Sequence, residues 1–212
     1  MRRAGHRRRR ALSLSPDAMK TSTRPAREKL LSTASRLFYS RGIHAVGIDE
    51  IVARAGIAKM SLYNNFASKD ELVCEYLHRQ SASLLEAFAH GAAGPGSARE
   101  RLLAIFDTLT NILLAPTFRG CPFIRAASEL AGLRPPHPGL KVCADHKVRF
   151  RTTIRDLAAE AGAPDPEALS ARLAVIVDGA LAQGALSEPE AMARHARGAA
   201  LQLIESALPQ AT

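Results

Sequence analysis

The sequence is poor in cysteine and in aromatic residues. Its 212 residues include only three cysteines, no tryptophan and 5% aromatic residues in all. The cysteines form no CxxC pair and have no spacing typical of metal ligands; they are Cys74, Cys121 and Cys143. Asp145, His146 and His195 lack such spacing as well. We therefore expect neither a disulfide framework nor a metal site, and free thiols favour a reducing, cytoplasmic compartment.

Long apolar runs are also absent. No segment approaches the ~18 consecutive apolar residues that a transmembrane helix needs. No apolar stretch follows the basic N-terminus as it does in a secretory signal, so we expect a cytoplasmic protein that does not bind membranes. No nucleophile–base pair, phosphate-binding loop or metal cluster stands at a recognisable spacing, so we expect neither an enzyme nor a bound cofactor.

Helical periodicity is the strongest pattern that the sequence does contain. Apolar residues recur at helical spacing in four successive segments, which cover about residues 25–41, 48–55, 58–66 and 68–90. Ser68, with Glu71 three residues later, forms a capping box at the start of the long fourth segment.

Further helical patterns follow the GAAGPG break of residues 91–96, separated by turns rich in Pro or Gly, at about residues 97–114, 121–133, 139–161, 165–186 and 189–208. No segment shows the alternation of a β-strand. We therefore predict an all-α protein of about nine helices. It would comprise a three-helix domain over residues 23–70 and a larger helical domain over residues 71–212, after a basic tail.

Residues 48–66 (IDEIVARAGIAKMSLYNNF) predict a helix-turn-helix. Gly56 permits a tight turn with positive φ, and apolar positions would hold the two helices against the first one: Ile51, Val52, Ile57, Leu62 and Phe66. The second helix of such a pair presents outward residues to the major groove of DNA, here Ala58, Lys59, Met60, Ser61, Tyr63, Asn64 and Asn65. Both asparagines could instead be polar residues at a helix end, and of the two we select only Asn64 as a contact. Lys69, in the first turn of the next helix, is placed to bind phosphate.

The segment from about Ala26 to Leu72 resembles the DNA-binding domain of the TetR family of bacterial transcriptional regulators. The resemblance rests on the combination of FYSRG (38–42), DEIVARAGI (49–57), KMSLYNNF (59–66) and SKDEL (68–72). It implies phosphate contacts by Tyr63 and Lys69 and recognition-helix positions for Lys59, Met60, Ser61 and Asn64. The family usually has Ser or Thr at the start of the motif. This chain has Gly47 and Ile48 there, so a phosphate contact would come from backbone N–H groups.

The resemblance also implies a homodimer that binds double-stranded operator DNA. The favoured hypothesis is a repressor that a small apolar effector releases from its operator. An effector-independent architectural or activating DNA-binding factor is the alternative, and an enzyme is much less favoured. Lys59 and Lys69 could instead be ordinary solvated charges.

Apolar residues of the C-terminal part could line an effector pocket with two polar anchors, although such a pattern is also typical of plain core. The candidates are Phe106, Leu109, Leu113, Phe118, Phe123, Phe150 and the anchors His146 and Asp178. Cys121 could be a thiol switch. We favour a small buried residue at a helix start, because neither a basic partner nor a resolving cysteine is evident in the sequence.

Small and apolar stripes on the last two helices predict a dimer surface built as a four-helix bundle. One stripe holds Leu169, Leu173, Ile176 and Ala180, and the other holds Met192, Ala196, Ala199 and Leu203. The alternative is that these stripes only close the core of their own chain.

Residues 1–22 have no periodicity and carry six arginines, which predicts a disordered basic tail. Such an arm could lie along DNA phosphates or enter a minor groove. The alternative is that translation begins at Met19 and the tail is not made.

Overall fold

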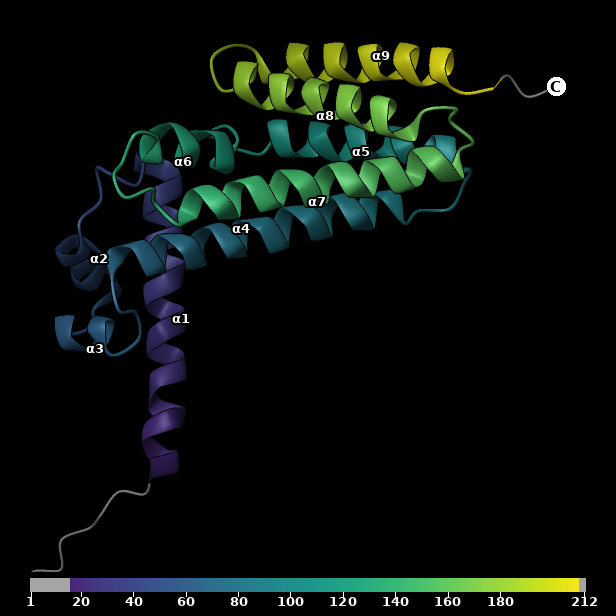
Figure 1. Cartoon of the computed structure of the whole chain (residues 1–212). Helices are drawn as coiled ribbons and strands as arrows, with labels where there is room; N and C mark the ends of the chain where they lie inside the picture. Colours follow the sequence, from purple (N-terminus) through teal and green to yellow (C-terminus); the bar gives the residue numbers. More distant parts are fainter. Residues whose placement is uncertain (1–15, 210–212) are drawn as a thin grey trace, which may run out of the picture.

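The computed structural model describes the backbone of residues 16–209 and the side chains of residues 25–209. This part of the chain forms nine helices and no strand, which confirms the all-α prediction (Figure 1). The helices are α1 (Pro16–Arg41), α2 (Ile48–Ala55), α3 (Lys59–Tyr63), α4 (Lys69–Ala92), α5 (Ala98–Leu113), α6 (Pro122–Leu130), α7 (Gly139–Glu160), α8 (Pro166–Gln183) and α9 (Pro189–Ala207).

The first helix begins at Pro16, upstream of the Pro25 that the periodicity indicates. The predicted disordered tail of residues 1–22 is therefore wrong for residues 16–22, whereas residues 1–15 and their arginines lie outside the described residues. The prediction missed this extension because residues 16–22 carry no regular apolar spacing. Extending an existing helix is much easier than nucleating one, so an extension does not need an apolar face.

The helices α1, α2 and α3 pack around a small apolar core that includes Leu37, Ile51 and Leu62, all buried. Gly56 ends α2 with a φ of 59°, in the left-handed region that strains residues with side chains. The turn between α2 and α3 therefore depends on glycine, and the pair forms the predicted helix-turn-helix.

The long helix α4 connects these three helices to the C-terminal part (Figure 1). Near its start Tyr76 packs against Phe38 of α1, with ring centroids 5.6 Å apart. Towards its end Phe88 packs against Phe150 of α7, at 4.7 Å. The predicted domain boundary at residue 70 falls in the first turn of this helix, and one continuous apolar core runs through both parts of the chain.

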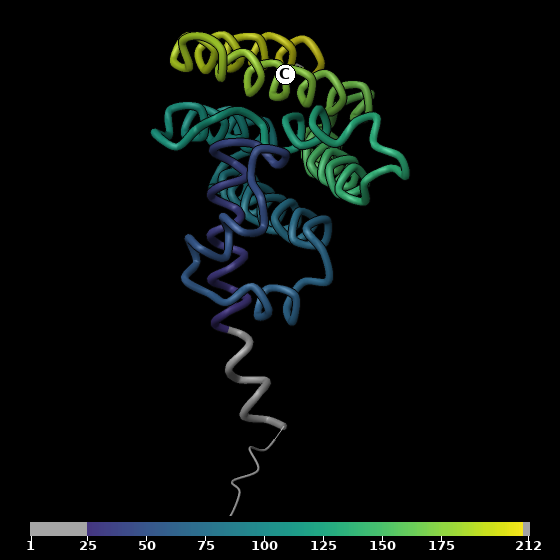
Figure 2. Tube along the Cα trace, turned by 90° about the vertical axis from the view of Figure 1, so that its left-hand side faces the viewer, coloured from purple at the N-terminus to yellow at the C-terminus, as the bar shows by residue number. Residues whose placement is uncertain are grey.

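The C-terminal helices are arranged in layers. In both views α8 and α9 lie on the side of the molecule farthest from α2 and α3, beyond α5 and α7 (Figures 1 and 2). The short helix α6 lies beside the C-terminal end of α1 (Figure 1). None of the described helices is both long and apolar enough to span a bilayer.

Ser68 caps the start of α4, because its hydroxyl accepts a hydrogen bond from the backbone N–H of Glu71 at 3.1 Å. We expect Ser68→Ala to lower the free energy of unfolding by about 1 kcal/mol, since that N–H loses its partner. Ser83→Ala, at an exposed position inside the same helix, should leave stability unchanged or raise it slightly. Urea unfolding measures both variants, and equal losses would show that the cap contributes nothing.

Candidate nucleic-acid interface and C-terminal cavity

The helix α3 is buried on one side and exposed on the other. Leu62 is fully buried under the helix, whereas Met60 is 70% exposed and Tyr63 is 46% exposed. Met60 and Tyr63 are therefore not part of the core. Lys59 and Asn64 are exposed on α3 and at its C-cap, so this surface presents a cation, a hydroxyl and an amide together.

The other predicted contact residues lie around this surface. Gly47 is the N-cap of α2 and makes no side-chain cap, while Ile48 begins the helix half-buried. Ala58 is the exposed N-cap of α3, and Ser61 is half-buried. Asn65, which we did not select, donates from its side chain to the Ser61 carbonyl at 2.7 Å and so is bound to its own helix.

Lys59 is paired within the chain. Its ammonium lies 2.7 Å from the carboxylate of Asp49 on α2. This hydrogen bond with Asp49 raises the pKa of Lys59. Both side chains are more than half exposed, so a phosphate or a base can replace the carboxylate.

Lys69 lies in the first turn of α4 and reaches back to the loop before α2. Its ammonium donates a hydrogen bond to the Ile43 carbonyl at 2.8 Å. Burial lowers its pKa, partly offset by the charges of Asp70 and Glu129. The ammonium has three N–H donors. It could therefore bind a phosphate while it keeps its hydrogen bond to the Ile43 carbonyl.

The C-terminal end of α1 is bound directly to α6 and the loop before it. The Tyr39 hydroxyl donates to the Gly120 carbonyl at 3.0 Å and accepts from the Arg119 N–H at 2.9 Å. Arg125 of α6 donates to the Tyr39 carbonyl at 2.6 Å. Glu129, also on α6, accepts from the His44 N–H at 2.8 Å. Any movement of α6 therefore acts on the helix that supports α2 and α3.

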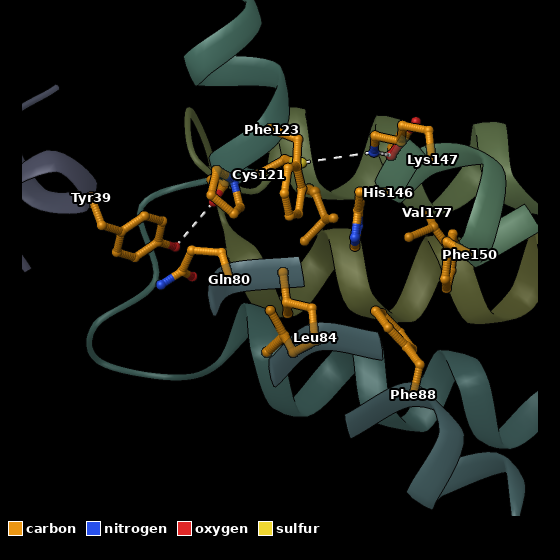
Figure 3. A pocket seen from close by; sticks show the side chains of 15 residues that line it. Tyr39, Gln80, Leu84, Phe88, Cys121, Phe123, His146, Lys147, Phe150 and Val177 are labelled. Atoms are coloured by element: carbon orange, nitrogen blue, oxygen red, sulfur yellow. Dashed lines mark hydrogen bonds and ion pairs between the residues drawn. The ribbon is translucent and has the colours of Figure 1, made fainter. Parts of the chain in front are cut away.

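A cavity of about 120 Å³ lies next to this junction (Figure 3). Its wall is mostly apolar and draws on α1, α4, α5, α6, α7, α8 and the loop before α6. The lining residues are Tyr39, Gln80, Leu84, Phe88, Ile112, Gly120, Cys121, Pro122, Phe123, His146, Lys147, Phe150, Val177, Asp178 and Leu181. Tyr39 thus belongs both to the cavity wall and to the helix beneath the helix-turn-helix.

Half of the predicted pocket residues line this cavity: Phe123, Phe150, His146 and Asp178. The prediction was wrong for the rest. Phe106 and Leu109 are buried in the core and do not reach the cavity, while Leu113 and Phe118 border a separate surface hollow near Pro189. An apolar stripe indicates only that one face of a helix is buried in the protein. It cannot distinguish a face packed in the core from one that lines a cavity. For the same reason, five further lining residues could not be recognised from the sequence as part of a cavity wall: Leu84, Phe88, Ile112, Val177 and Leu181.

His146 is held by two contacts inside the C-terminal part. Its Nδ1 lies 3.0 Å from the hydroxyl of Ser81 on α4, and its ring stacks on Phe123 at 3.7 Å. Burial, together with the charges of Lys147 and Arg149, lowers its pKa to about 4. His146 is therefore neutral at pH 7 and adds no charge to the cavity wall.

Cys121 has the basic neighbour that its sequence context did not reveal. It is the N-cap of α6 and only 3% exposed, as expected for a small buried residue at a helix start. The Lys147 ammonium, however, lies 3.8 Å from its Sγ and forms an ion pair with Asp178 (Figure 3). Lys147 is on α7, so only the packing of α7 against α6 and α8 creates this cluster.

The predicted dimer stripes divide into two halves. Leu169, Leu173, Ala180 and Ala196 are buried in the core of their own chain, so the prediction of a dimer surface is wrong for these four. Ile176, Met192 and Leu203 are half-buried, and Ala199 alone is exposed. The exposed side of α8 instead carries Val175, 71% exposed, and continues to Leu186, 84% exposed, just beyond the helix. Both sides of α8 are apolar, so the pattern did not show which one faces inward.

Comparison with known proteins gives a consistent result. The profile described as "Bacterial regulatory proteins, tetR family" matches residues 30–76. The chain is 37% identical over 87 residues to the HTH-type transcriptional activator FasR of Mycolicibacterium smegmatis, which covers 41% of this chain and 40% of FasR. It is 30% identical over 109 residues to the HTH-type transcriptional repressor NemR of Escherichia coli, which covers 50% and 55%. The matches thus span about half the length of these curated relatives.

Similarity in structure extends over nearly the whole chain. The TetR-family transcriptional regulator SCO4454 from Streptomyces coelicolor superimposes with a TM-score of 0.81 at 31% identity, covering 86% of this chain and 95% of that one. The agreement therefore includes the C-terminal helices.

The low pKa of His146 makes stability depend on pH. Between pH 6.5 and about 4 the unfolded chain takes up a proton that the folded chain excludes, so the free energy of unfolding falls as the pH falls. His146→Asn keeps a polar atom towards Ser81 and removes the titration. It should therefore reduce this pH dependence, by at most about 1.4 kcal/mol per pH unit.

Urea unfolding at a series of pH values checks this expectation. His195→Asn, at an exposed position of α9, is the control and should keep the full pH dependence. Parallel curves for the wild type and His146→Asn would show that another group causes the acid sensitivity.

Proposed function

The chain belongs to the TetR family of bacterial transcriptional regulators, and we propose that it is a homodimeric repressor that a small apolar molecule releases from its operator. The observation that carries DNA binding is the exposed face of α3, with Met60 and Tyr63 outside and Leu62 buried beneath. We assign residues 23–70 to DNA binding and residues 71–212 to dimerisation and ligand binding. In this proposal the protein acts by binding and not by catalysis.

We assign the DNA contacts by their position on α2, α3 and the start of α4. Lys59, Met60 and Ser61 of α3 and Asn64 at its C-cap would face base edges, as residues of a recognition helix do. Tyr63, Lys69 and the backbone N–H groups at Gly47 and Ile48 would contact phosphates. Ala58, the exposed N-cap of α3, would lie against the groove wall. Two copies of this surface would read a near-palindromic site in successive major grooves.

The cavity supports ligand control because its wall includes Tyr39 of α1. A ligand there would press on the segment that holds the Tyr39 hydroxyl, and so shift α6 relative to the helix-turn-helix. Such coupling typically amounts to about 1–3 kcal/mol, or about 5–150-fold in operator affinity.

Repression is favoured over activation in this proposal because ligand-induced release of DNA is the simplest outcome of that coupling. Activation is the second candidate, since one relative of this chain is named an activator and another a repressor. Footprinting of the purified protein on its own genome separates the two functions. A site over the promoter supports repression, and a site upstream of the promoter supports activation.

The exposed side of α8 supplies the dimer surface in this proposal. It presents Val175, and on the same side Gly179 has open space where a side chain would project. A small residue at that position lets a helix of a second copy approach closely. Together with Ala199 and the half-buried Met192 and Leu203 of α9, it would form a four-helix bundle.

Replacing Tyr63 tests the phosphate contact. We expect Tyr63→Ala to weaken binding about 10–100-fold, because a hydrogen bond to a charged group is lost. The loss should be similar for the operator and for unrelated DNA, since phosphates carry no sequence information. Lys59→Ala and Asn64→Ala should instead change base preference. Fluorescence anisotropy with an operator selected from random duplexes measures all three.

Tyr63→Phe is the matched control, since it keeps the ring and removes only the hydroxyl. If Tyr63→Ala and Tyr63→Phe both bind like the wild type at moderate salt, the assignment of Tyr63 is wrong. If the unmodified protein selects no duplex at all, the proposal of DNA binding fails.

Val175→Glu tests the dimer surface. Val175 is mostly exposed in one chain, so a charge there should leave the fold intact while opposing the approach of a second copy. We expect a monomer by light scattering, with an unchanged circular dichroism spectrum. Leu173→Ala, in the buried stripe that we first predicted, should instead cost about 2–5 kcal/mol of unfolding free energy. A Val175→Glu protein that remains dimeric would place the interface elsewhere.

A further inference from the structure

We propose that the cavity beside the junction of α1 and α6 binds one uncharged aromatic ring that carries a single hydrogen-bonding group, of which phenol is the simplest example. Binding of the ring can be measured without DNA. Its effect on operator binding rests on the proposed function, for which the ring would be the effector.

The volume of the cavity limits the ligand to one ring. An apolar cavity of about 150 Å³ stays dry and binds benzene, and this cavity measures about 120 Å³. A six-membered ring with one small substituent is therefore near the upper limit. Two fused rings exceed it, because a packed interior must be displaced to admit a larger group.

The wall of the cavity is itself rich in flat rings. Phe123 is stacked on His146 with ring centroids 3.7 Å apart, and Phe88 packs against Phe150 at 4.7 Å and an angle of 50°. All four rings line the cavity (Figure 3). Aromatic rings attract one another in offset-stacked and edge-to-face arrangements. An aromatic ligand would extend these two pairs, whereas an aliphatic ring would gain from burial alone.

The charges in the wall are balanced within the protein. Among the described residues that line the cavity, Lys147 and Asp178 are the only Lys, Arg, Asp or Glu residues, and they form an ion pair with each other. His146 is uncharged at pH 7, because burial lowers its pKa to about 4. A charged ligand would therefore enter an apolar space without a free counter-ion, which is strongly unfavourable. These observations favour an uncharged ligand.

One polar side chain of the wall is left for the ligand. Gln80 of α4 lines the cavity and is half-buried, and its amide lies on the side of Tyr39 (Figure 3). The Tyr39 hydroxyl is already bound to the segment before α6. The Gln80 amide has no hydrogen-bond partner among residues 25–209. An amide both donates and accepts, so it can bind a hydroxyl in either direction.

The position of Gln80 on α4 fits a ring with a polar group at one end. Gln80, Leu84 and Phe88 follow one another at intervals of four residues, so they share one face of the helix. A ring beside Leu84 would have Phe88 on one side and the Gln80 amide on the other. Its polar end would then lie next to Tyr39 of α1, which supports the helix-turn-helix.

Isothermal titration calorimetry of the full chain at pH 7 tests the class of ligand. We expect phenol to bind once per chain with a Kd below about 1 mM. Benzoate should bind at least about tenfold more weakly because its charge has no partner, and 2-naphthol likewise because its second ring does not fit. The proposed class would be overturned if phenol does not bind, or if either of the other two binds as tightly.

Gln80→Leu separates the hydrogen bond from apolar burial. This variant should bind phenol about 3–10-fold more weakly and should bind toluene, which has no hydroxyl, like the wild type. Gln202→Leu, at an exposed position of α9, is the matched control and should change neither affinity. Equal losses for phenol and toluene, or no loss for phenol, would overturn the assignment of Gln80.

Filling the cavity tests where the ring binds. Val177 lines the cavity and is buried, so Val177→Phe should abolish the binding of phenol and of toluene. Leu84→Phe fills the same space from the half-buried Leu84 and replaces the first variant if circular dichroism shows that it is unfolded. Phenol binding that persists in a folded filled variant would overturn the site.

Operator affinity is then measured with and without saturating phenol. We expect phenol to lower the affinity of the wild type at least about fivefold, and to leave that of the filled variant at its own value without phenol. Unchanged affinity of the wild type would overturn the role of the ring as effector. A protein that binds phenol but no operator would overturn the proposed function, and the ligand site would stand.

Discussion

The burial of α4 in both parts of the chain is the constraint on which the rest of the structure depends. Tyr76 packs against α1 near the start of this helix, and Phe88 packs against α7 near its end. Packed interiors yield little to local deformation. The same helix carries Leu84 and Phe88 in the cavity wall and Lys69, which holds the loop before α2, so it joins the cavity to the helix-turn-helix.

The junction between α1 and α6 provides a second connection of a different kind. Its hydrogen bonds join Tyr39 to Gly120, Arg119 and Arg125, and these groups lie directly beside the cavity. Apolar packing through α4 and directional hydrogen bonds through α6 thus reach the helix-turn-helix from two sides. In the proposed function, these two connections would carry a change at the cavity to the helix-turn-helix.

The cations that matter for binding are already paired inside the chain. Lys59 is bound to Asp49, Lys69 to the Ile43 carbonyl, and Lys147 to Asp178. Exposed ion pairs contribute little to stability, so exchanging Asp49 for a phosphate costs little. The Lys147–Asp178 pair is less exposed than the Lys59–Asp49 pair. The net charge of +9 therefore does not show which cations are available to bind DNA, because that depends on the partner of each cation.

The sequence by itself determined the helices, the helix-turn-helix and the family, because these follow from local rules. Helical spacing, the Ser68 cap and the turn at Gly56 each depend on residues that are close together in the chain. The same is true of the motif that ends at Phe66. Only the tertiary structure decided which side of α8 faces inward, which apolar residues line a cavity, and that Lys147 lies beside Cys121. These features join segments far apart in the chain, and an apolar residue has the same pattern whether it contacts core, cavity or partner. Position in space, which side-chain packing fixes, distinguishes the three.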